Sequence, residues 1–459
     1  MKYILFNIKS KLVLYKFFSK LRYKNNMGGG LMQLVAYGAQ DIYLTGNPQI
    51  TFFKVVYRRH TNFSMEAIEQ TFNGTVGFGN TVSATISRNG DLVHRMYVEW
   101  SPLLFQGIND IQHACANMGN ALIKEVEIEI GGQLIDKHYG HWLTTWTDLT
   151  ELNPSGTQKV PDTNTGGESA LATDVLHGTK LQLMSYNHQG FSKDITQSVA
   201  PASAFIPLQF WFCRNPGLAL PLIALQYHEV KVKILFPSFS DLTTRTQTFS
   251  PCKLWCDYIY LDTDERRRFA QVSHEYLIEQ LQFQKQSSGT ATKTDLNFNH
   301  PVKELIWTGV PKTGVISAEY KYAGVSTPGK IGTTVNVGAT LPITDKFKLT
   351  LNGHERFAER HAYYFTRNQV WQHHTGFGGV TQKNSIAVYS FALKPEEHQP
   401  SGTCNFSRID NAQLTHPAMA ATAAQSANRR GRDDGIHIYA VNYNVLRIMS
   451  GMGGLAYSN

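Results

Sequence analysis

The chain has 459 residues, of which 42% are hydrophobic, 12% aromatic and only 17% charged. This balance excludes a disordered protein, and the length favours two packed domains of roughly 200 residues each. The formal net charge of +8 does not by itself indicate nucleic-acid binding, because its meaning depends on where the charge lies.

The first 26 residues hold almost all of that charge. They contain seven basic residues and no acidic one, so residues 27–459 carry only 8 − 7 = +1. A nearly neutral body lacks the electrostatic footprint of a DNA-binding domain, so we expect no direct nucleic-acid binding. Lysines interrupt every apolar run, which disfavours a signal peptide or a transmembrane helix. We interpret residues 1–26 as a basic arm whose loose amphipathic pattern allows membrane contact. The alternative is an upstream start codon, with Met27 opening the domain proper.

Short alternating or apolar runs bounded by Gly, Asn and Pro dominate the rest of the chain. Such runs predict β-strands joined by turns. The clearest are TFFKVVYRR from Thr51, TVSATIS from Thr81, KEVEIEI from Lys124, HEVKVKILF from His228 and LWCDYIYLD from Leu254. Helices are predicted only near residues 141–149 and 264–272.

Three segments predict tight turns, because they contain residues that accept a positive φ. They are Arg88-Asn89-Gly90-Asp91, Gly131-Gly132 and Leu351-Asn352-Gly353.

Two pairs of segments indicate that the halves of the chain repeat one plan. EIEIGGQLIDKHYGHW from Glu127 matches KLTLNGHERFAERHAYY from Lys348, each a strand, a two-residue turn and a second segment with acidic, His and aromatic residues. YHEVKVKILF from Tyr227 resembles IHIYAVNYNVLRI from Ile436 in pattern more than identity. A duplicated all-β domain explains both pairs. We place the connector at residues 263–275, between domains spanning 27–262 and 276–459.

Long polar segments, at residues 151–203, 311–345 and 411–435, interrupt the halves. Loops of this length are uncommon in compact domains unless they have a function, and exposed loops at a particle surface are one such role. Two strand sandwiches with long excursions fit paired jelly rolls better than a propeller or immunoglobulin domains. Periodicity alone establishes only two all-β domains.

A phosphate-binding loop is the best enzyme-like pattern in the sequence. Gly324-Val-Ser-Thr-Pro-Gly329-Lys330 has its spacing, but Ile331 cannot ligate magnesium, and the segment lies among Gly and Thr rather than between a strand and a helix. We interpret it as a surface loop.

The histidines do not predict a metal site. Metal-binding jelly rolls usually need His-x-His or His-x-Asp/Glu on one strand, and none of the 17 histidines has such a partner. His138 and His141 flank a turn, while His373 and His374 would point to opposite faces of a strand. Surface or hydrogen-bonded histidines are the preferred interpretation.

The five cysteines, one of them Cys115, lack CxxC spacing, which favours reduced thiols. Cys252 and Cys256 share one face of a predicted strand, so they are expected to be small buried hydrophobic residues rather than zinc ligands.

No nucleophile motif and no acid–base pair is apparent. Glu396-Glu397 follows Pro395 and is typical of a solvated turn. Asn62, Asn73 and Asn405 satisfy the glycosylation rule, but three matches are expected by chance, and we do not predict that they are modified. We therefore predict no catalytic, cofactor-binding or metal-ligating residue.

Several uninterrupted blocks resemble the major capsid proteins of nucleocytoplasmic large DNA viruses, in particular those of the phycodnavirus and chlorovirus type. The match runs from Met27 to the last residue. The blocks are GGGLMQLVAYGAQDIYLTGNPQITFFKVVYRRHTNF from Gly28, NPGLALPLIALQYHEVKV from Asn215, DYIYLDTDERRRFAQ from Asp257, HEYLIEQLQF from His274, YSFALKPEEHQPSGTCNFSRIDNA from Tyr389 and YNVLRIMSGMGGLAYSN from Tyr443. The arm before Met27 and the segments 151–203 and 311–345 have no clear counterpart.

The resemblance implies an all-β fold of two consecutive eight-stranded antiparallel jelly rolls with short helices and long loops. It also implies a structural, non-enzymatic protein without a cofactor, which forms homotrimeric, pseudo-hexameric capsomers. These would tile an icosahedral shell over an inner membrane, next to other capsomers and to minor capsid and penton proteins. The implied location is the virion capsid, assembled in the host cytoplasm.

A carbohydrate-binding jelly roll that acts as an attachment protein is the alternative. Its site would lie in the long loops and would need exposed aromatic residues. The segments 151–203 and 311–345 contain few of them, chiefly Tyr186, Phe191, Tyr320 and Tyr322.

Overall fold

The computed structural model describes residues 36, 38–100, 118–152, 180–185, 203–238, 251–287, 291–311, 346–376, 386–417 and 433–457. The basic arm, most of the three long polar segments, the glycine-rich segment 324–330 and Cys115 lie outside these ranges. The chain divides into two compact units, Met1–Thr61 and Asn62–Asn459.

In the first unit the described residues form two short helical turns and an extended chain. The turns are the 3-10 helix η1 (Ala39–Asp41) and the helix α3 (Ile42–Thr45). The strand predicted from Thr51 is wrong, since residues 51–59 pair with no other described strand. Alternating apolar residues give this segment a β preference, but a strand also needs a neighbour for its backbone N–H and C=O groups.

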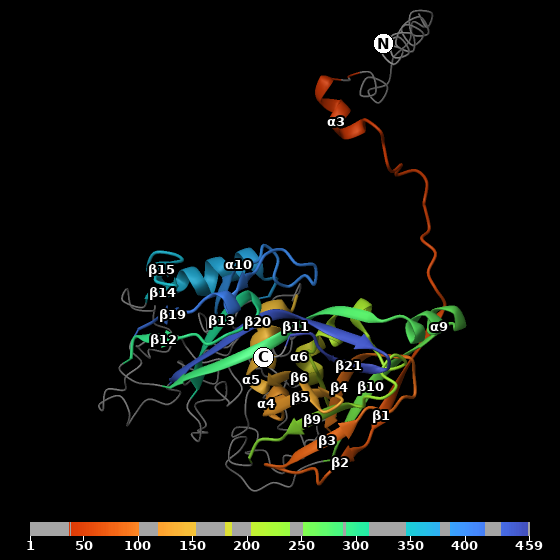
Figure 1. Cartoon of the computed structure of the whole chain (residues 1–459). Coiled ribbons are helices and arrows are strands. Elements are labelled where there is room, and N and C mark those ends of the chain that lie inside the picture. The colour runs from red at the N-terminus through yellow and green to blue at the C-terminus, as the bar shows by residue number, and fades with distance from the viewer. Residues whose placement is uncertain are drawn as a thin grey trace, which may run out of the picture. The chain divides into compact units, whose positions relative to one another are not determined.

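In the second unit, the first half of the chain forms two antiparallel sheets (Figure 1). One has the order β1-β10-β4-β7, with β8 beside β4, and the other has the order β2-β3-β9-β5-β6. The bounds are β1 Phe63–Gln70, β2 Phe72–Asn73, β3 Thr81–Thr85, β4 Leu92–Trp100, β5 Glu125–Ile130, β6 Gln133–Tyr139, β7 Ala204–Pro207, β8 Leu220–Pro221, β9 Val230–Leu235 and β10 Cys252–Leu261.

Strict alternation explains how these strands build a core. In β5 and β9 the valines and isoleucines are buried while the intervening Glu and Lys side chains are partly exposed. Lys233 on β9 pairs with Glu129 on β5 across the outer face. One face of each strand therefore fills the space between the sheets and the other meets solvent.

The second half forms two further antiparallel sheets, ordered β11-β20-β13-β17 and β12-β19-β14-β15. The short strands β18 and β21 extend the first of them, and β16 pairs with β14. The bounds are β11 His274–Ser287, β12 Lys293–Asp295, β13 Pro301–Pro311, β14 Lys346–Leu351, β15 His354–Glu355, β16 Arg360–His361, β17 Ile386–Ser390, β18 Cys404–Asn405, β19 Ala412–Thr415, β20 Asp433–Met449 and β21 Met452–Leu455.

Both halves share one strand order. Leaving aside the short strands β2, β8, β16, β18 and β21, each half has eight described strands. In each, one sheet joins the first, eighth, third and sixth strands, and the other joins the second, seventh, fourth and fifth. This is the order of a jelly roll, so the predicted double jelly roll is confirmed.

The repeat inferred from sequence is right for one pair of segments and wrong for the other. The hairpins β5–β6 and β14–β15 are the fourth and fifth strands of their halves, as predicted. However, β9 is the seventh strand of the first half and β20 is the eighth strand of the second half. The prediction that these two segments are equivalent strands is therefore wrong. Both are central strands with many buried residues, which gives them similar hydrophobic patterns.

The two predicted helices are confirmed as α5 (Gly140–Thr150) and α9 (Thr263–Gln271). The latter begins at Asp262, whose side chain accepts a hydrogen bond from the Thr263 N–H. The sequence did not predict the remaining described helical segments of the second unit, which lack a helical apolar period. They are α4 (Met118–Ala121), α6 (Lys180–Ser185), α7 (Trp211–Arg214), the 3-10 helices η4 (Pro216–Leu218) and η7 (Phe406–Arg408), the π-helix η6 (Tyr364–Asn368) and α10 (Gln369–His373).

Two of the three predicted turns have the expected backbone. Gly131 and Gly132 have φ of 59° and 84°, and Asn352 and Gly353 have 48° and 79°. The prediction for 88–91 is wrong: neither Asn89 nor Gly90 has a positive φ, and the segment crosses from β3 in one sheet to β4 in the other. Gly90 is required for space, because a Cβ there would lie 2.8 Å from the Tyr258 Cβ.

Candidate assembly surfaces and the junction between the halves

Helix α5, from the first half, packs on a sheet of the second half. All ten residues from Gly140 to Leu149 are buried. Trp142, Trp146 and Leu149 form an apolar cluster with residues of β13, β17 and β20. The two indole rings lie 5.4 Å apart, and the Trp142 ring lies 5.0 Å from that of Tyr439. The junction between the jelly rolls is therefore an interior, not a solvated contact.

Strand β13 is buried on both faces because of this helix. Leu305 and Trp307 point into the core between the two sheets of the second half. Ile306 belongs to the cluster around α5, and the Thr308 hydroxyl lies 3.5 Å from His141 Nε2. This explains why the strand is rich in apolar residues on both faces.

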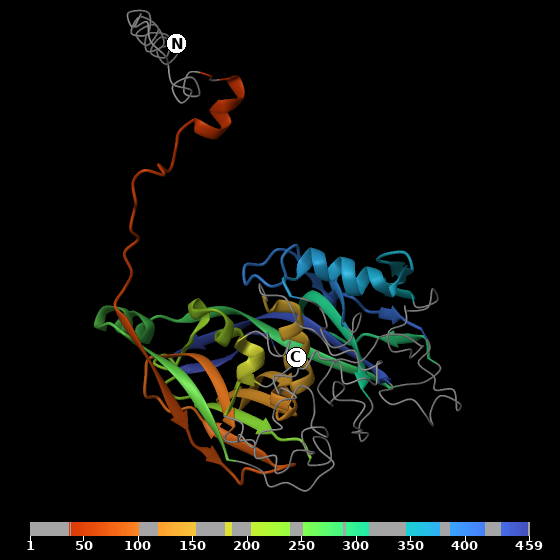
Figure 2. The same ribbon diagram turned by 180° about the vertical axis from the view of Figure 1, so that it is seen from behind.

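The long strands β11 and β20 make a second junction (Figure 2). Ile278, Leu446 and Ile448, near their ends, belong to the core cluster of the first half. The hairpin to β21 is anchored there as well, because the Tyr227 N–H donates to the Gly451 carbonyl at 2.9 Å. The second half thus contributes to the hydrophobic core of the first, while α5 of the first half forms a separate apolar cluster with the second.

His141 is hydrogen-bonded, as expected from sequence, because its Nδ1 lies 2.8 Å from the Tyr439 hydroxyl. His138 Nε2 lies 2.9 Å from Asp136 Oδ2, and the His138 ring stacks on that of Phe210. Burial lowers the pKa of His141 to about 3, so its imidazole is neutral. A neutral ring suits the apolar junction.

His373 and His374 lie at the C-terminal end of α10, so the strand on which they would point to opposite faces is not present. His374 is buried between two carboxylates: its Nδ1 and Nε2 each lie 2.9 Å from a carboxylate oxygen, of Glu396 and Glu304 respectively. The prediction of a solvated Glu396 is wrong as well, while Glu397 is exposed and pairs with Lys394. Sequence reasoning missed this cluster because its members lie on separate elements.

The described residues contain no group of three or more His, Cys, Asp or Glu side chains able to hold a metal ion. Cys252 and Cys256 are buried on one face of β10, as predicted, and burial raises the pKa of the Cys252 thiol to about 12. A thiol of this kind is a poor metal ligand and a poor nucleophile.

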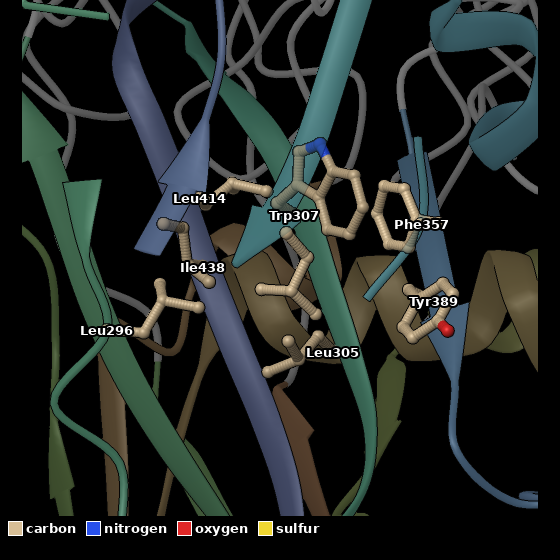
Figure 3. Close-up of a pocket in the computed structure, with 8 residues that line it drawn as sticks. Leu296, Leu305, Trp307, Phe357, Tyr389, Leu414 and Ile438 are labelled. Atoms are coloured by element: carbon tan, nitrogen blue, oxygen red, sulfur yellow. The ribbon is translucent and has the colours of Figure 1, made fainter. Parts of the chain in front are cut away.

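One apolar recess lies in the second half, within the core between the sheets (Figure 3). It is lined by Leu296, Leu305, Trp307, Leu349, Phe357, Tyr389, Leu414 and Ile438. It has no room for a water molecule and no converging charged groups. We interpret it as packing space of the jelly-roll core.

Large apolar side chains are exposed in both units. In the first unit, Phe52 and Phe53 are 88% and 98% exposed. In the second unit, Trp371 is 81% exposed, and Leu393 and Tyr227 are each 76% exposed. Exposed aromatic residues of this size are enriched in protein–protein interfaces, so they mark candidate assembly contacts. The sequence signal was the run TFFKVVY, which was assigned to a strand instead.

The three glycosylation-type asparagines, Asn62, Asn73 and Asn405, are exposed. The Asn405 side chain also accepts a hydrogen bond from the Ser407 N–H at 3.1 Å. That they are unmodified stays a prediction.

None of the helices in the described ranges is long and apolar enough to cross a membrane.

Two family models together match most of the chain. The model described as "Major capsid protein N-terminus" matches residues 51–262, and "Large eukaryotic DNA virus major capsid protein" matches residues 265–454. The chain belongs to this capsid protein family. Membership gives it a structural role in the virion capsid.

The chain is also similar in sequence and structure to individual capsid proteins. The chain is 49% identical to the major capsid protein of Pyramimonas orientalis virus and 44% identical to that of Paramecium bursaria Chlorella virus 1, with 94% of this chain and all of each relative aligned. A chain of the PBCV-1 virus capsid, in a quasi-atomic model, is 38% identical with a TM-score of 0.65, covering 89% of this chain and 100% of that one. The Faustovirus major capsid protein, at 15% identity and a TM-score of 0.60, shares the fold, with 98% and 99% of the two chains covered.

Proposed function

We propose that three copies of this chain form a pseudo-hexameric capsomer, and that these capsomers tile an icosahedral shell of a large double-stranded DNA virus. The observation that carries the proposal is the common strand order of the two halves. Three chains with two similar domains each supply six similar sides, which is what a near-hexagonal tile requires. The exposed Trp371 and Leu393 provide apolar contacts for such an assembly.

The proposal also assigns residue ranges to two domains and a connector, and names the partners of the chain. We assign residues 27–262 and 276–459 to two domains, whose jelly-roll strands begin with β1 at Phe63 and β11 at His274, and residues 263–275, with the charged helix α9, to the connector. The chain has no catalytic, cofactor or direct nucleic-acid role, and its partners are copies of itself, minor capsid proteins and penton proteins. Assembly takes place in the host cytoplasm.

We expect the purified protein to be a trimer. Three chains of 51.5 kDa have a mass of about 155 kDa, which size-exclusion chromatography with light scattering measures directly. Negative-stain images of the same fraction should show particles with a near-hexagonal outline. A stable monomer that does not assemble at any concentration would contradict the proposal.

We also propose that residues 1–26 contact the inner membrane. Their seven positive charges are attracted to anionic lipid headgroups, and each contributes about 1 kcal/mol near such a surface. The full-length chain should therefore float with anionic vesicles at low salt, and a chain that begins at Met27 should not. Equal flotation of both chains would rule out a membrane role for the arm.

A further inference from the structure

Trp146, on helix α5, lies between cations at the junction of the two jelly rolls. The Arg214 guanidinium is 4.6 Å from its ring centroid and the Lys303 ammonium is 5.9 Å from it. Both cations pair with Glu279 on β11, Arg214 at 2.9 Å and Lys303 at 2.7 Å. Arg214 comes from the first half and the other two charges from the second, so this cluster spans the junction.

His374 approaches the same indole from the second half. The two ring centroids are 6.5 Å apart, and the rings meet edge to face. Both imidazole nitrogens lie 2.9 Å from carboxylate oxygens, those of Glu304 on β13 and Glu396 in the loop after β17. A ring that serves two carboxylates must donate from both nitrogens, so it carries a positive charge.

The residues that follow His374 hold the end of α5. The Gly376 N–H donates to the Leu149 carbonyl at 2.7 Å. The Thr375 hydroxyl lies 3.1 Å from the Thr150 carbonyl and 2.7 Å from Glu396 Oε2. A Cβ on Gly376 would lie 2.4 Å from a backbone oxygen of α5, so this contact is backbone against backbone. The last turn of the helix is thus capped by the other jelly roll.

We infer that these side chains form a largely buried charge lock that couples the two jelly rolls, and that the positive charge on His374 keeps it closed. Its charged members are Arg214, Glu279, Lys303, Glu304, His374 and Glu396, and the uncharged Trp146 and the exposed Thr375 link them to α5. If His374 loses its proton to solvent, only one N–H remains for two carboxylates. One carboxylate then loses its donor in a buried site, and the cap on α5 loosens.

The lock has a defined dependence on pH. Burial alone would lower the pKa of His374, but Glu304 and Glu396 outweigh it and raise the pKa to about 9, above the ordinary 6.5. These carboxylates are the charged groups bonded to the ring, and α5 adds the buried Asp148 near the same junction. Because the folded pKa is the higher one, the stabilisation is complete below about pH 6.5 and is lost as the pH rises through 9.

The test compares the full-length protein with His374→Gln by scanning calorimetry between pH 6.5 and 10. At pH 6.5 the wild type should have a folding equilibrium constant larger by on the order of a hundredfold, and most of this advantage should vanish by pH 10. Two protein concentrations separate this effect from dissociation of an oligomer. A difference that does not change with pH would overturn the inference.

His373→Gln is the matched control, because it removes the neighbouring imidazole, whose Nδ1 lies 3.2 Å from the Leu393 carbonyl. It should follow the wild type at every pH. If His374→Gln does not fold, Thr375→Val provides a second test. Amide exchange should then accelerate in the last turn of α5 and stay unchanged in β3 and β9, and unchanged exchange in α5 would contradict the lock.

Discussion

Trp307→Ala is expected to lower the free energy of unfolding by about 3–5 kcal/mol. The Trp307 side chain is fully buried, and its ring lies 5.5 Å from that of Phe347 and 5.2 Å from that of Phe365. It packs inside the core of the second half, so its removal leaves a cavity among these rings. Urea unfolding followed by circular dichroism measures the loss.

Trp307→Phe is the control for this prediction. The indole N–H has no hydrogen-bond partner among the described residues, so its loss should cost little. Phenylalanine retains the contacts with the neighbouring rings, and the expected cost is well below that of alanine. Equal losses for both variants would mean that the ring packing is not what stabilises this core.

Trp142→Ala should also lower the free energy of unfolding by about 3–5 kcal/mol, but for a different reason. Trp142 belongs to the first jelly roll, but its ring packs against Tyr439 of the second. Its removal weakens the coupling between the halves and not the core of either one. Scanning calorimetry should therefore show one transition for the wild type and two for the variant.

Thr150→Ala provides a matched control on the same helix. Its hydroxyl donates to the Trp146 carbonyl within α5, and the side chain is only partly buried. We expect a change within about 1 kcal/mol and a single transition. If Trp142→Ala also unfolded in one transition, with little loss of unfolding free energy, the packing of α5 would not be what couples the two halves.

Local patterns predicted the elements whose partners are close or whose alternation is strict. Strands β5 and β9 alternate residue by residue, and Asp262 begins α9 with a helix cap, so both features are visible in a short window. Cys252 and Cys256 could be placed on one buried face for the same reason.

The junction could not be predicted because its contacts are distant in sequence. His141 and Tyr439 are separated by 298 positions and Glu304 and His374 by 70, and no periodicity relates them. The pairing of Glu396 with the buried His374 also contradicted the expectation that a Glu beside Pro395 is solvated. The strand predicted from Thr51 is absent for another reason. The composition of this segment favours a strand, but no described strand lies beside it to pair with its backbone.

Helix α5 has a consequence for the order of synthesis. A ribosome releases Trp142, Trp146 and Leu149 well before it has made β13, β17 and β20, which cover them. Until the last strands emerge, the nascent polypeptide exposes these apolar side chains to solvent. Such exposed apolar surface favours aggregation and chaperone binding. The yield of native protein should therefore depend on how quickly translation reaches the C-terminus.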